Sequence, residues 1–332
     1  MKKMFLSLIS LSIVALTVTS FVIITKANSV KAGAENLPKL EIRPLSKTGS
    51  SGNLANVNVV TPLPNLPTEL AVYKVKKPDL TGEQVKQQAL KLGITNGTVK
   101  ESPIDFKVLT PEGDYIVDKE TGSFSYLIKD FELQTEPLKT ILSDEEYKKL
   151  ATDFLNNKGL MKTEAIFKDV NKGNTVTVLE NGLEKHYPFM IEVRFGRDLN
   201  NLQWDGVGPK ISVYLGENGK IIGAASVWRE VEVANKYPII SVALALEQIK
   251  SNDAIIYDAG ANDTGTIKEI KLMYMSDPIG YDQQNVIPYY MMVGTNEAGK
   301  PFAAFTRAIS KSYLSEIPLP PVEAPIPRRS TK

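Results

Sequence analysis

Residues 115–128 read YIVDKETGSFSYLI, and this stretch indicates the fold more directly than any other part of the chain. Two runs rich in β-branched and aromatic residues flank the short segment DKETG, which ends at Gly122. Runs of that composition favour strands, and glycine supplies the positive torsion angle that a tight connection between strands requires. The stretch therefore predicts an antiparallel hairpin.

More strands and tight turns follow along the chain. The other runs of strand-like composition cover residues 175–179, 187–195, 210–215, 221–228, 267–275, 288–293 and 301–308. Glycine closes the turn segments 110–113, 217–219 and 296–299, where a hairpin needs a positive torsion angle. Because hairpin turns join antiparallel neighbours, these signals disfavour a parallel doubly wound sheet.

Three segments carry helix signals. The first two begin with capping-box pairs, Thr81 with Gln84 and then Ser143 with Glu146. The third begins near residues 238–241, where a proline precedes a serine. Apolar residues then recur at helical spacing, namely Val85, Ala89 and Leu92; Tyr147, Leu150, Ala151, Phe154 and Leu155; and Val242, Ala245, Leu246 and Ile249. We expect these apolar stripes to face a core.

Each predicted helix is followed by strands that tight turns connect. The sequence therefore predicts an α+β fold of repeated helix-plus-antiparallel-meander units, with the helices packed on one face of curved sheets. The first unit is expected at residues 70–135, and the second and third units at residues 136–315.

The first 32 residues predict export from the cytoplasm. Lys2 and Lys3 precede an uncharged, apolar run at residues 4–25, and the segment ends in small residues at Ala32. This is the pattern of a signal peptide. The run is also long enough to cross a bilayer, so residues 1–32 are predicted to be either a cleaved signal or a membrane anchor. In both cases the rest of the chain is expected to be extracytoplasmic, either secreted or membrane-anchored.

Proline-rich segments flank the region of helices and strands. Residues 33–69 contain five prolines and a Gly-Ser patch, and residues 316–332 contain another five prolines. Proline fixes its own backbone φ and removes a hydrogen-bond donor, so both segments are expected to be extended rather than folded. We predict a tether at residues 33–69 and a loose tail at residues 316–332.

Charge and cysteine content exclude several classes of function. The 39 basic and 38 acidic residues leave a net charge of +1, so no overall field attracts the chain to nucleic acid. The chain has no cysteine, which excludes disulfides, thiolate nucleophiles and sulfur ligands to metals. An exported chain without disulfides suits the envelope of a Gram-positive bacterium.

The sequence contains no recognisable catalytic, metal or cofactor constellation. His186 is the only histidine, so the chain lacks the ligands for a zinc site, and we expect this residue at the surface near the start of a strand. Residues 169–180 match an EF-hand loop at three positions, but the order of residues 173–174 is reversed, and we predict a hairpin turn instead. We therefore predict no catalytic residue, no bound metal and no small-molecule cofactor.

Residues 196–209 form a polar insertion between two predicted strands. Long loops in compact domains are often functional, so this insertion is the predicted contact surface. Trp204 is its candidate anchor for a partner, because aromatic side chains often dominate the binding energy of interfaces. The alternative is that Trp204 folds back onto the sheet.

Several short motifs resemble those of known exported modules. The turn at residues 118–122, preceded by the helix that begins at Thr81, resembles the PepSY type of module. The segments 237–241, 270–275 and 287–290 are similar to the extracytoplasmic part of the membrane-anchored accessory regulators of the Gram-positive cell-wall sensor kinase. Both resemblances imply a non-catalytic inhibitor, checkpoint or adaptor at the membrane.

These observations together predict a non-catalytic binding or regulatory protein of the cell envelope that acts through protein-protein contacts. The expected partner is an envelope or membrane protein, with a sensor kinase among the candidates, and the membrane itself through residues 4–25 if the signal is retained. The alternative is an envelope glycan hydrolase or transglycosylase that uses paired carboxylates and therefore needs no cofactor. A structural or spacer role also fits the sequence.

Overall fold

The hairpin predicted from residues 115–128 is present in the computed structural model, which describes residues 36–45, 52–129, 136–206, 208–260, 263–277 and 282–317. Its turn is closed by the Asp118 carboxylate, which accepts hydrogen bonds from the backbone N–H (2.7 Å) and the hydroxyl (2.6 Å) of Thr121. Gly122 follows with a φ of 68°. The predicted turn chemistry is therefore confirmed.

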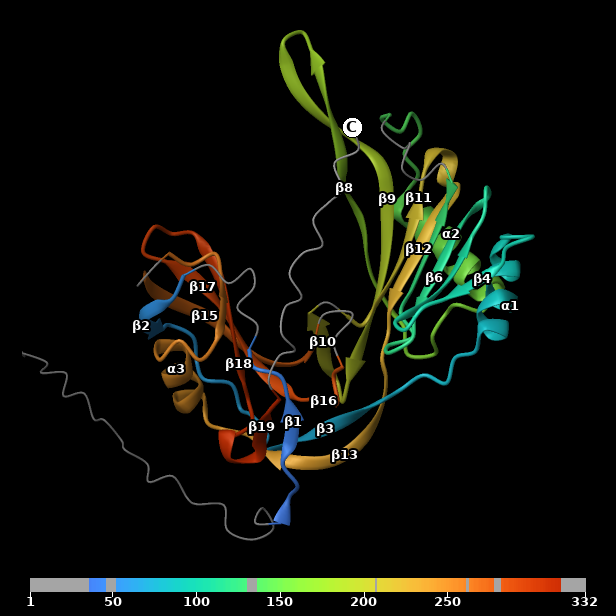
Figure 1. Ribbon diagram of the computed structural model, residues 1–332. Helices are drawn as coiled ribbons and strands as arrows, with labels where there is room; N and C mark the ends of the chain where they lie inside the picture. Colours follow the sequence, from blue (N-terminus) through green and yellow to red (C-terminus); the bar gives the residue numbers. More distant parts are fainter. Residues whose placement is uncertain are drawn as a thin grey trace, which may run out of the picture. The chain divides into compact units, whose positions relative to one another are not determined.

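The described ranges form 19 strands and three α-helices, which Figure 1 shows in sequence colours. The strands are β1 Leu40–Ile42, β2 Leu54–Val59, β3 Glu69–Lys76, β4 Val99–Glu101, β5 Asp105–Leu109, β6 Gly113–Asp118, β7 Phe124–Ile128, β8 Ile166–Glu180, β9 Leu183–Leu199, β10 Leu202–Gly206, β11 Lys210–Leu215, β12 Ile221–Val227, β13 Glu230–Pro238, β14 Ile255–Tyr257, β15 Asp263–Ser276, β16 Asn285–Val286, β17 Pro288–Asn296, β18 Pro301–Arg307 and β19 Leu314–Glu316. The helices are α1 Gly82–Leu92, α2 Asp144–Asn157 and α3 Val242–Lys250.

One sheet of 14 strands contains most of these elements. Its order is β14-β18-β17-β15-β10-β9-β11-β12-β7-β6-β5-β4, with β2 beside β15 and β8 beside β9. Strands β13, β3 and β16 form a second sheet, and β1 pairs with β19 in a third. Most pairs are antiparallel, and the parallel ones are β1 with β19, β10 with β15 and β2 with β15.

The predicted fold of repeated α+β units is wrong, because the chain is mainly β. Strands hold 51% of the described residues and helices 16%. The predicted boundary at residue 135 does not separate sheets, since β7 on one side of it pairs with β12 on the other. Local turn signals indicate which strands are consecutive, but they do not show that strands from different parts of the chain will pair. Residues Asn36–Lys332 form one compact unit.

The three predicted helices are confirmed at their predicted starts. Thr81 and Ser143 each complete a capping box, and the Ser241 hydroxyl accepts a hydrogen bond from the backbone N–H of Leu244. Helices α1 and α2 pack their apolar stripes against the strands from β4 to β12, except that Leu150 is exposed, and α3 packs on β2 and β18. Capping residues of this kind stabilise a helix by about 1 kcal/mol, while packing of the apolar face supplies most of its stability.

The predicted tether at residues 33–69 is wrong where the structure describes it. Leu40 and Ile42 of β1 are buried, and β1 pairs with β19. Leu54 is fully buried at the start of β2, which pairs with β15. The prolines of this segment lie outside both strands, where proline does not remove a hydrogen bond from a sheet. Proline content thus concealed two short strands.

Other predictions fall partly or wholly outside the described residues. The signal or anchor at residues 1–32, including the apolar run at residues 4–25, lies outside them, as does most of the tail, residues 318–332. Within the described ranges, no helix is both long enough and apolar enough to span a bilayer.

The buried position of Leu54 predicts a large effect of its truncation. Leu54→Ala is expected to lower the free energy of unfolding by about 2–5 kcal/mol, because it opens a cavity in the core. Leu63→Ala is the matched control, since Leu63 belongs to the same proline-rich segment but is 63% exposed, and its effect is expected within about 0.5 kcal/mol. Urea unfolding of the full chain measures both values. Equal, small effects would mean that the segment is a tether after all.

Candidate binding groove

A groove of about 830 Å³ opens among the described residues. Its lining comes from residues 64–67, from five strands and from the β9–β10 turn. The residues are Glu69, Leu70, Ala71 and Tyr73 of β3; Asn200 and Asn201 of the turn; Leu202 and Gln203 of β10; Val233 and Lys236 of β13; Ile270, Lys271, Leu272 and Met273 of β15; and Met291 of β17. Its volume lies within the range of about 300–1,000 Å³ that is usual for binding pockets. Most of these side chains are apolar, so the groove suits an apolar occupant.

One wall of the groove comes from the paired strands β3 and β13. Tyr73 lies opposite Val233, and the register then shifts so that Asn235 lies opposite Val72. Such a bulge bends a strand and changes the direction of its side chains. Val233 remains 63% exposed beside this bulge. An apolar side chain is thus held at the wall of the groove without being covered by the fold.

The facing part of the groove is formed by β15 and the tight β9–β10 turn. Ile270 and Leu272 are almost fully buried and fix the β15 backbone to the core. Asn200 and Asn201 have φ values of 50° and 61°, as a two-residue hairpin turn with two left-handed positions requires. Asparagine tolerates this conformation better than most residues, so the sequence itself determines the tight turn.

The charged groups of the groove lie in exposed ion pairs. Lys236 pairs with Glu69 at 3.5 Å, and Lys271 pairs with Glu269 at 2.7 Å. Pairs of this kind contribute about 0–1 kcal/mol to stability, so they can exchange partners at little cost. Among the described lining residues, Glu69 is the only carboxylate. The groove therefore combines an apolar interior with a charged rim whose ion pairs contribute little to stability.

The structure places Trp204 in the core and not on a surface. The insertion predicted at residues 196–209 is mostly the end of β9 and the strand β10, joined by the two-residue turn. Trp204 is 2% exposed, lies opposite Tyr274 of β15 and belongs to the same apolar cluster as Tyr73. This corresponds to the alternative in which Trp204 folds back on the sheet.

Trp204 instead takes part in a buried arginine arrangement that the sequence did not indicate. The Arg197 guanidinium lies 5.1 Å from the ring centre of Trp204 and 5.3 Å from that of Trp228. It donates a hydrogen bond of 3.0 Å to the carbonyl of Arg229 and forms an ion pair with Glu164. Cation–π contacts strengthen when the charge is desolvated, and Arg197 is only 3% exposed. Trp204 meets Arg197 across the β9–β10 hairpin, whereas Glu164, Trp228 and Arg229 come from distant parts of the chain, which local sequence does not reveal.

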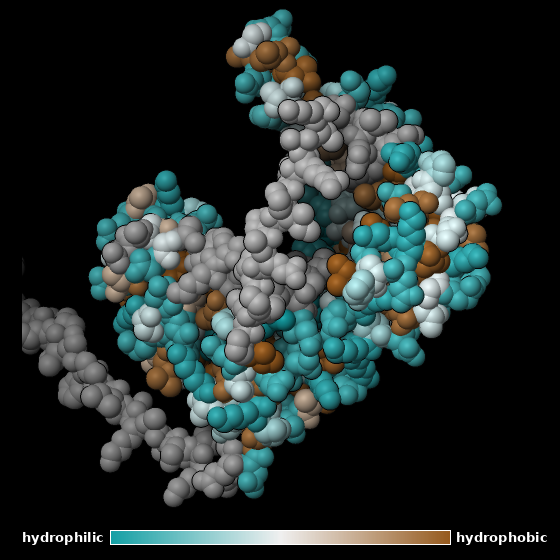
Figure 2. All heavy atoms as spheres, in the orientation of Figure 1, coloured by the Kyte–Doolittle hydropathy of each residue, from teal (hydrophilic) through white to brown (hydrophobic). Residues whose placement is uncertain are grey.

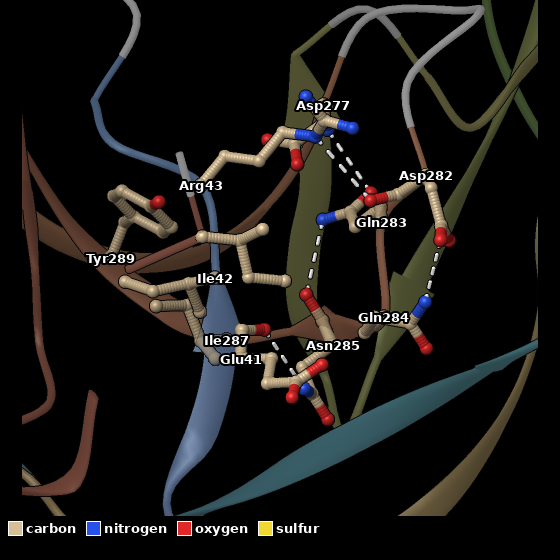
Figure 3. A pocket seen from close by; sticks show the side chains of 11 residues that line it. Glu41, Ile42, Arg43, Asp277, Asp282, Gln283, Gln284, Asn285, Ile287 and Tyr289 are labelled. Carbon is tan, nitrogen blue, oxygen red and sulfur yellow. Dashed lines mark hydrogen bonds between the residues drawn. The ribbon is translucent and has the colours of Figure 1, made fainter. Parts of the chain in front are cut away.

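A small polar pocket lies near Arg229, another buried arginine. Figure 3 shows that Arg43, Asp277 and Gln283 converge there, with Tyr289 at one side. The side-chain Oε1 of Gln283 accepts a hydrogen bond of 3.0 Å from the backbone N–H of Asp277, and the Arg229 guanidinium donates to the backbone carbonyl of Asp277 at 3.0 Å. The pocket volume of about 20 Å³ is sufficient for a water molecule. It is too small for an organic substrate.

Burial raises the pKa of the Asp277 carboxyl above its ordinary value, although the charges of Arg229, Arg43 and Arg307 oppose this shift. Burial also lowers the pKa of Arg229, against the attraction of Asp277. The pocket therefore contains groups whose charged forms are disfavoured by desolvation and partly restored by one another. Such mutual compensation is typical of a structural polar network. The small volume of the pocket gives no access to a substrate.

The remaining predicted features are placed as follows. His186 lies in β9 at the surface, with Nδ1 3.0 Å from the Thr177 hydroxyl. Residues 169–180 are part of β8 and not a hairpin turn, which instead lies at residues 181–182. No group of three or more metal-ligating side chains occurs among the described residues.

The chain matches no described protein family and no curated protein. Among solved structures it is similar to an uncharacterized protein from Eubacterium rectale ATCC 33656, at 11% sequence identity and a TM-score of 0.44. The similarity covers 77% of this chain and 89% of that chain. It assigns no function, so the residues of the chain themselves must support any proposal.

The raised pKa of Asp277 predicts the sign of a pH effect. Above the ordinary value of 3.8, the unfolded chain releases this proton while the folded chain keeps it up to the raised pKa. The contribution of Asp277 to stability is therefore present at low pH and is lost as the pH rises. Asp277→Asn removes this titration. The unfolding free energy of the unsubstituted chain minus that of the variant should be larger at about pH 4 than at about pH 7.

Urea unfolding at the two pH values, followed by tryptophan fluorescence, measures this difference. Trp204 and Trp228 are both buried, and they are the only tryptophans of the chain, so their emission reports the adjacent core. A difference that increases with pH would contradict the assignment and would mean that the arginines hold the carboxylate charged.

Proposed function

We propose that the chain is an exported or membrane-tethered, non-catalytic binding protein of the cell envelope that regulates a partner through protein-protein contacts at the groove. The observation that carries this proposal is the apolar, open groove with an uncovered side chain, Val233, on its wall. Extended apolar surfaces that are rimmed by polar residues typically mark interaction sites. The export pattern at residues 1–32 supports the location.

The proposed occupant is an extended, apolar segment of an envelope or membrane protein. Strand β13 supports this choice, because among the described strands it pairs only with β3 and its other edge is open. An extended segment can add to such an edge by backbone hydrogen bonds while its alternate side chains enter an adjacent hollow. Val233 and Lys236 of β13 both line the groove, so edge and hollow adjoin.

The regulated partner that we favour is a membrane protein such as a sensor kinase. Support for this choice comes from the short motifs at residues 237–241, 270–275 and 287–290, which are similar to those of accessory regulators. One of these segments lies at the groove, since residues 270–273 line it, and the first begins directly after the lining residue Lys236. The motif at residues 270–275 therefore connects the resemblance with the apolar hollow.

A carboxylate-based glycan hydrolase receives no support from this groove. Such an enzyme needs two carboxyl groups about 5–10 Å apart beside the scissile bond. Among the described lining residues, the groove offers Glu69 alone, and this carboxylate pairs with Lys236. A paired-carboxylate mechanism would have to use another part of the chain.

The proposed contact predicts that a charge in the groove will prevent partner binding. Val233→Glu places an ionised group in an apolar contact, and we expect about a tenfold or greater loss of partner recovery, because central apolar contacts contribute more than about 1 kcal/mol. Leu244→Glu is the matched control, since Leu244 is 56% exposed on α3 and does not line the groove. The variant is expected to retain full recovery.

The measurement is crosslinking in the native membrane of the producing cell, followed by mass spectrometry, with the full chain and both variants. Recovery of a membrane protein that is lost only with Val233→Glu supports the proposal. Equal recovery with both variants would show that the groove is not the contact. Recovery of glycan strands alone would favour the hydrolase alternative.

A further inference from the structure

The hairpin of β8 and β9 extends beyond the strands that flank it (Figure 1). On one side, β11 pairs with β9 from Ile191 to Phe195, and no described strand pairs with β9 before Ile191 except β8. Residues 175–180 of β8 therefore pair only with residues 183–188 of β9. A two-stranded ribbon of this kind is marginally stable in water by itself. We therefore expect it to contact another molecule.

The outer edge of β8 is open. Among the described residues, β8 pairs with β9 alone, and β9 occupies only one of its two edges. Residues 174–179 read NTVTVL, with no charge and no proline. Natural sheets usually protect such an edge with charges, prolines or bulges, because an uncharged edge is a template for another strand. The bulges of β8 lie between residues 167 and 175, so they protect its first part only.

The tip of the hairpin is apolar and exposed. Leu179 is 71% exposed and Leu183 is 67% exposed, on either side of the turn at residues 181–182. Figure 2 shows apolar atoms gathered at the end of this hairpin. Two of the nearby charges pair with each other, since Lys185 lies 2.5 Å from the Glu180 carboxylate, which also accepts a hydrogen bond of 2.7 Å from the Tyr187 hydroxyl, and Glu184 is exposed. The uncharged part of this surface is the backbone edge and the two leucines.

We propose that this edge pairs with the same edge of a second copy of the chain. The two β8 strands run antiparallel, with a twofold axis at Thr177, and form a four-stranded sheet in the order β9, β8, β8, β9. In this register Thr177 lies opposite Thr177 of the second copy, Val176 lies opposite Val178, and Thr175 lies opposite Leu179. The interface is therefore isologous and closes on itself.

The side chains select this register. A twofold axis normal to the sheet places residues of the same face opposite each other, so it must pass through one residue of the regular segment, residues 175–179. Centring on Thr177 pairs that whole segment with itself. Moving the centre by one residue toward Val176 would oppose Val178 with Asn174, and moving it toward Val178 would oppose Val176 with Glu180. Valine pairs stabilise antiparallel neighbours better than either of these pairs.

Charge and space also fit a second copy. The register places Glu180 opposite the uncharged Asn174, so no like charges meet. The turn at residues 181–182 of the second copy reaches only as far as Lys172 and Gly173, which are both exposed. Glycine at that position leaves room for the approaching turn.

The paired segment is short, and the interface is therefore below the size of standard stable interfaces. We expect copies that associate and dissociate, with the membrane or a high local concentration increasing the paired fraction. Covalent trapping is the suitable assay for such an interface. The chain contains no cysteine, so a single introduced thiol forms disulfides without competition from native thiols.

The test is disulfide formation in the full chain with Thr177→Cys. Opposed residues of antiparallel strands have Cα atoms about 4.5–5.5 Å apart, within the range of disulfides. A covalent dimer on a non-reducing gel is therefore expected. Thr175→Cys is the matched control, exposed on the same strand and the same face. Its two copies would be about 13 Å apart along the strand, so no dimer is expected from it.

A mixture of the variants Thr175→Cys and Leu179→Cys extends the test, because these positions oppose each other in the proposed register. We expect a disulfide between the two different variants and little within either one. Equal dimer from Thr175→Cys and Thr177→Cys would indicate random collision and would overturn the proposal. Absence of dimer from Thr177→Cys, with unchanged tryptophan emission showing an intact fold, would also overturn it.

If Thr177→Cys gives no dimer, a second experiment tests whether the two leucines bind a lipid surface instead. The Leu179→Cys variant is labelled with a polarity-sensitive fluorophore and mixed with phosphatidylglycerol vesicles. A blue shift of its emission would assign the two leucines to a lipid surface and count against pairing of copies. Failure at this hairpin would leave the groove proposal intact, because Val233 lies on β13.

Discussion

Backbone hydrogen bonding of β9 is the constraint on which the rest of the structure depends. A buried strand must satisfy its donors and acceptors along both edges, and β9 does so with three different partners, β8, β11 and β10. Ile191, Val193 and Phe195 enter the core beneath α1 and α2, whereas Leu199 enters a separate cluster with Trp204. One strand thus contributes to two cores. Its continuity, together with the pairing of β7 with β12, means that the predicted units do not exist as separate domains.

The groove follows from the same constraint. Strand β10 pairs antiparallel with β9 and parallel with β15, so the β9–β10 turn must lie beside the first part of the β15 segment that lines the groove. The second sheet, with β3 and β13, supplies the opposing wall. Aromatic contact holds the two parts together, because Tyr73 of β3 packs edge-on against Tyr274 of β15 with ring centres 5.2 Å apart. The Tyr274 hydroxyl also donates a hydrogen bond of 2.8 Å to the Ala71 carbonyl.

Local signals predicted local structure, and long-range pairing was beyond them. The capping pairs of Thr81 and Ser143 located two helices because a cap acts within four residues. The turn at Gly122 was predictable for the same reason. In contrast, Trp204 was assigned to a loop because its strand is short and its partner, β15, lies far along the chain. Proline in residues 33–69 concealed β1 and β2, since the prolines flank both strands. The groove as a whole could not be predicted as a site, because its walls meet only in the folded sheets, although its lining residues 200–203 lie within the insertion that was predicted as a contact surface.

The two proposed contacts use different groups of the chain, namely side chains in the groove and the backbone at the hairpin edge. The groove binds by its side chains, so a single charge at Val233 can remove it while the backbone stays unchanged. The hairpin edge binds by its backbone, and its side chains serve mainly to set the register at Thr177. Because β9 carries the hairpin at one end and the turn that lines the groove at the other, both contacts are fixed to one continuous strand. Residues 192–195, which pair with β8 on one edge and with β11 on the other, form the part of β9 between them that is held on both edges. Two copies joined at β8 would therefore each keep a groove whose position is determined by the shared sheet, which is the geometry that a bivalent regulator requires.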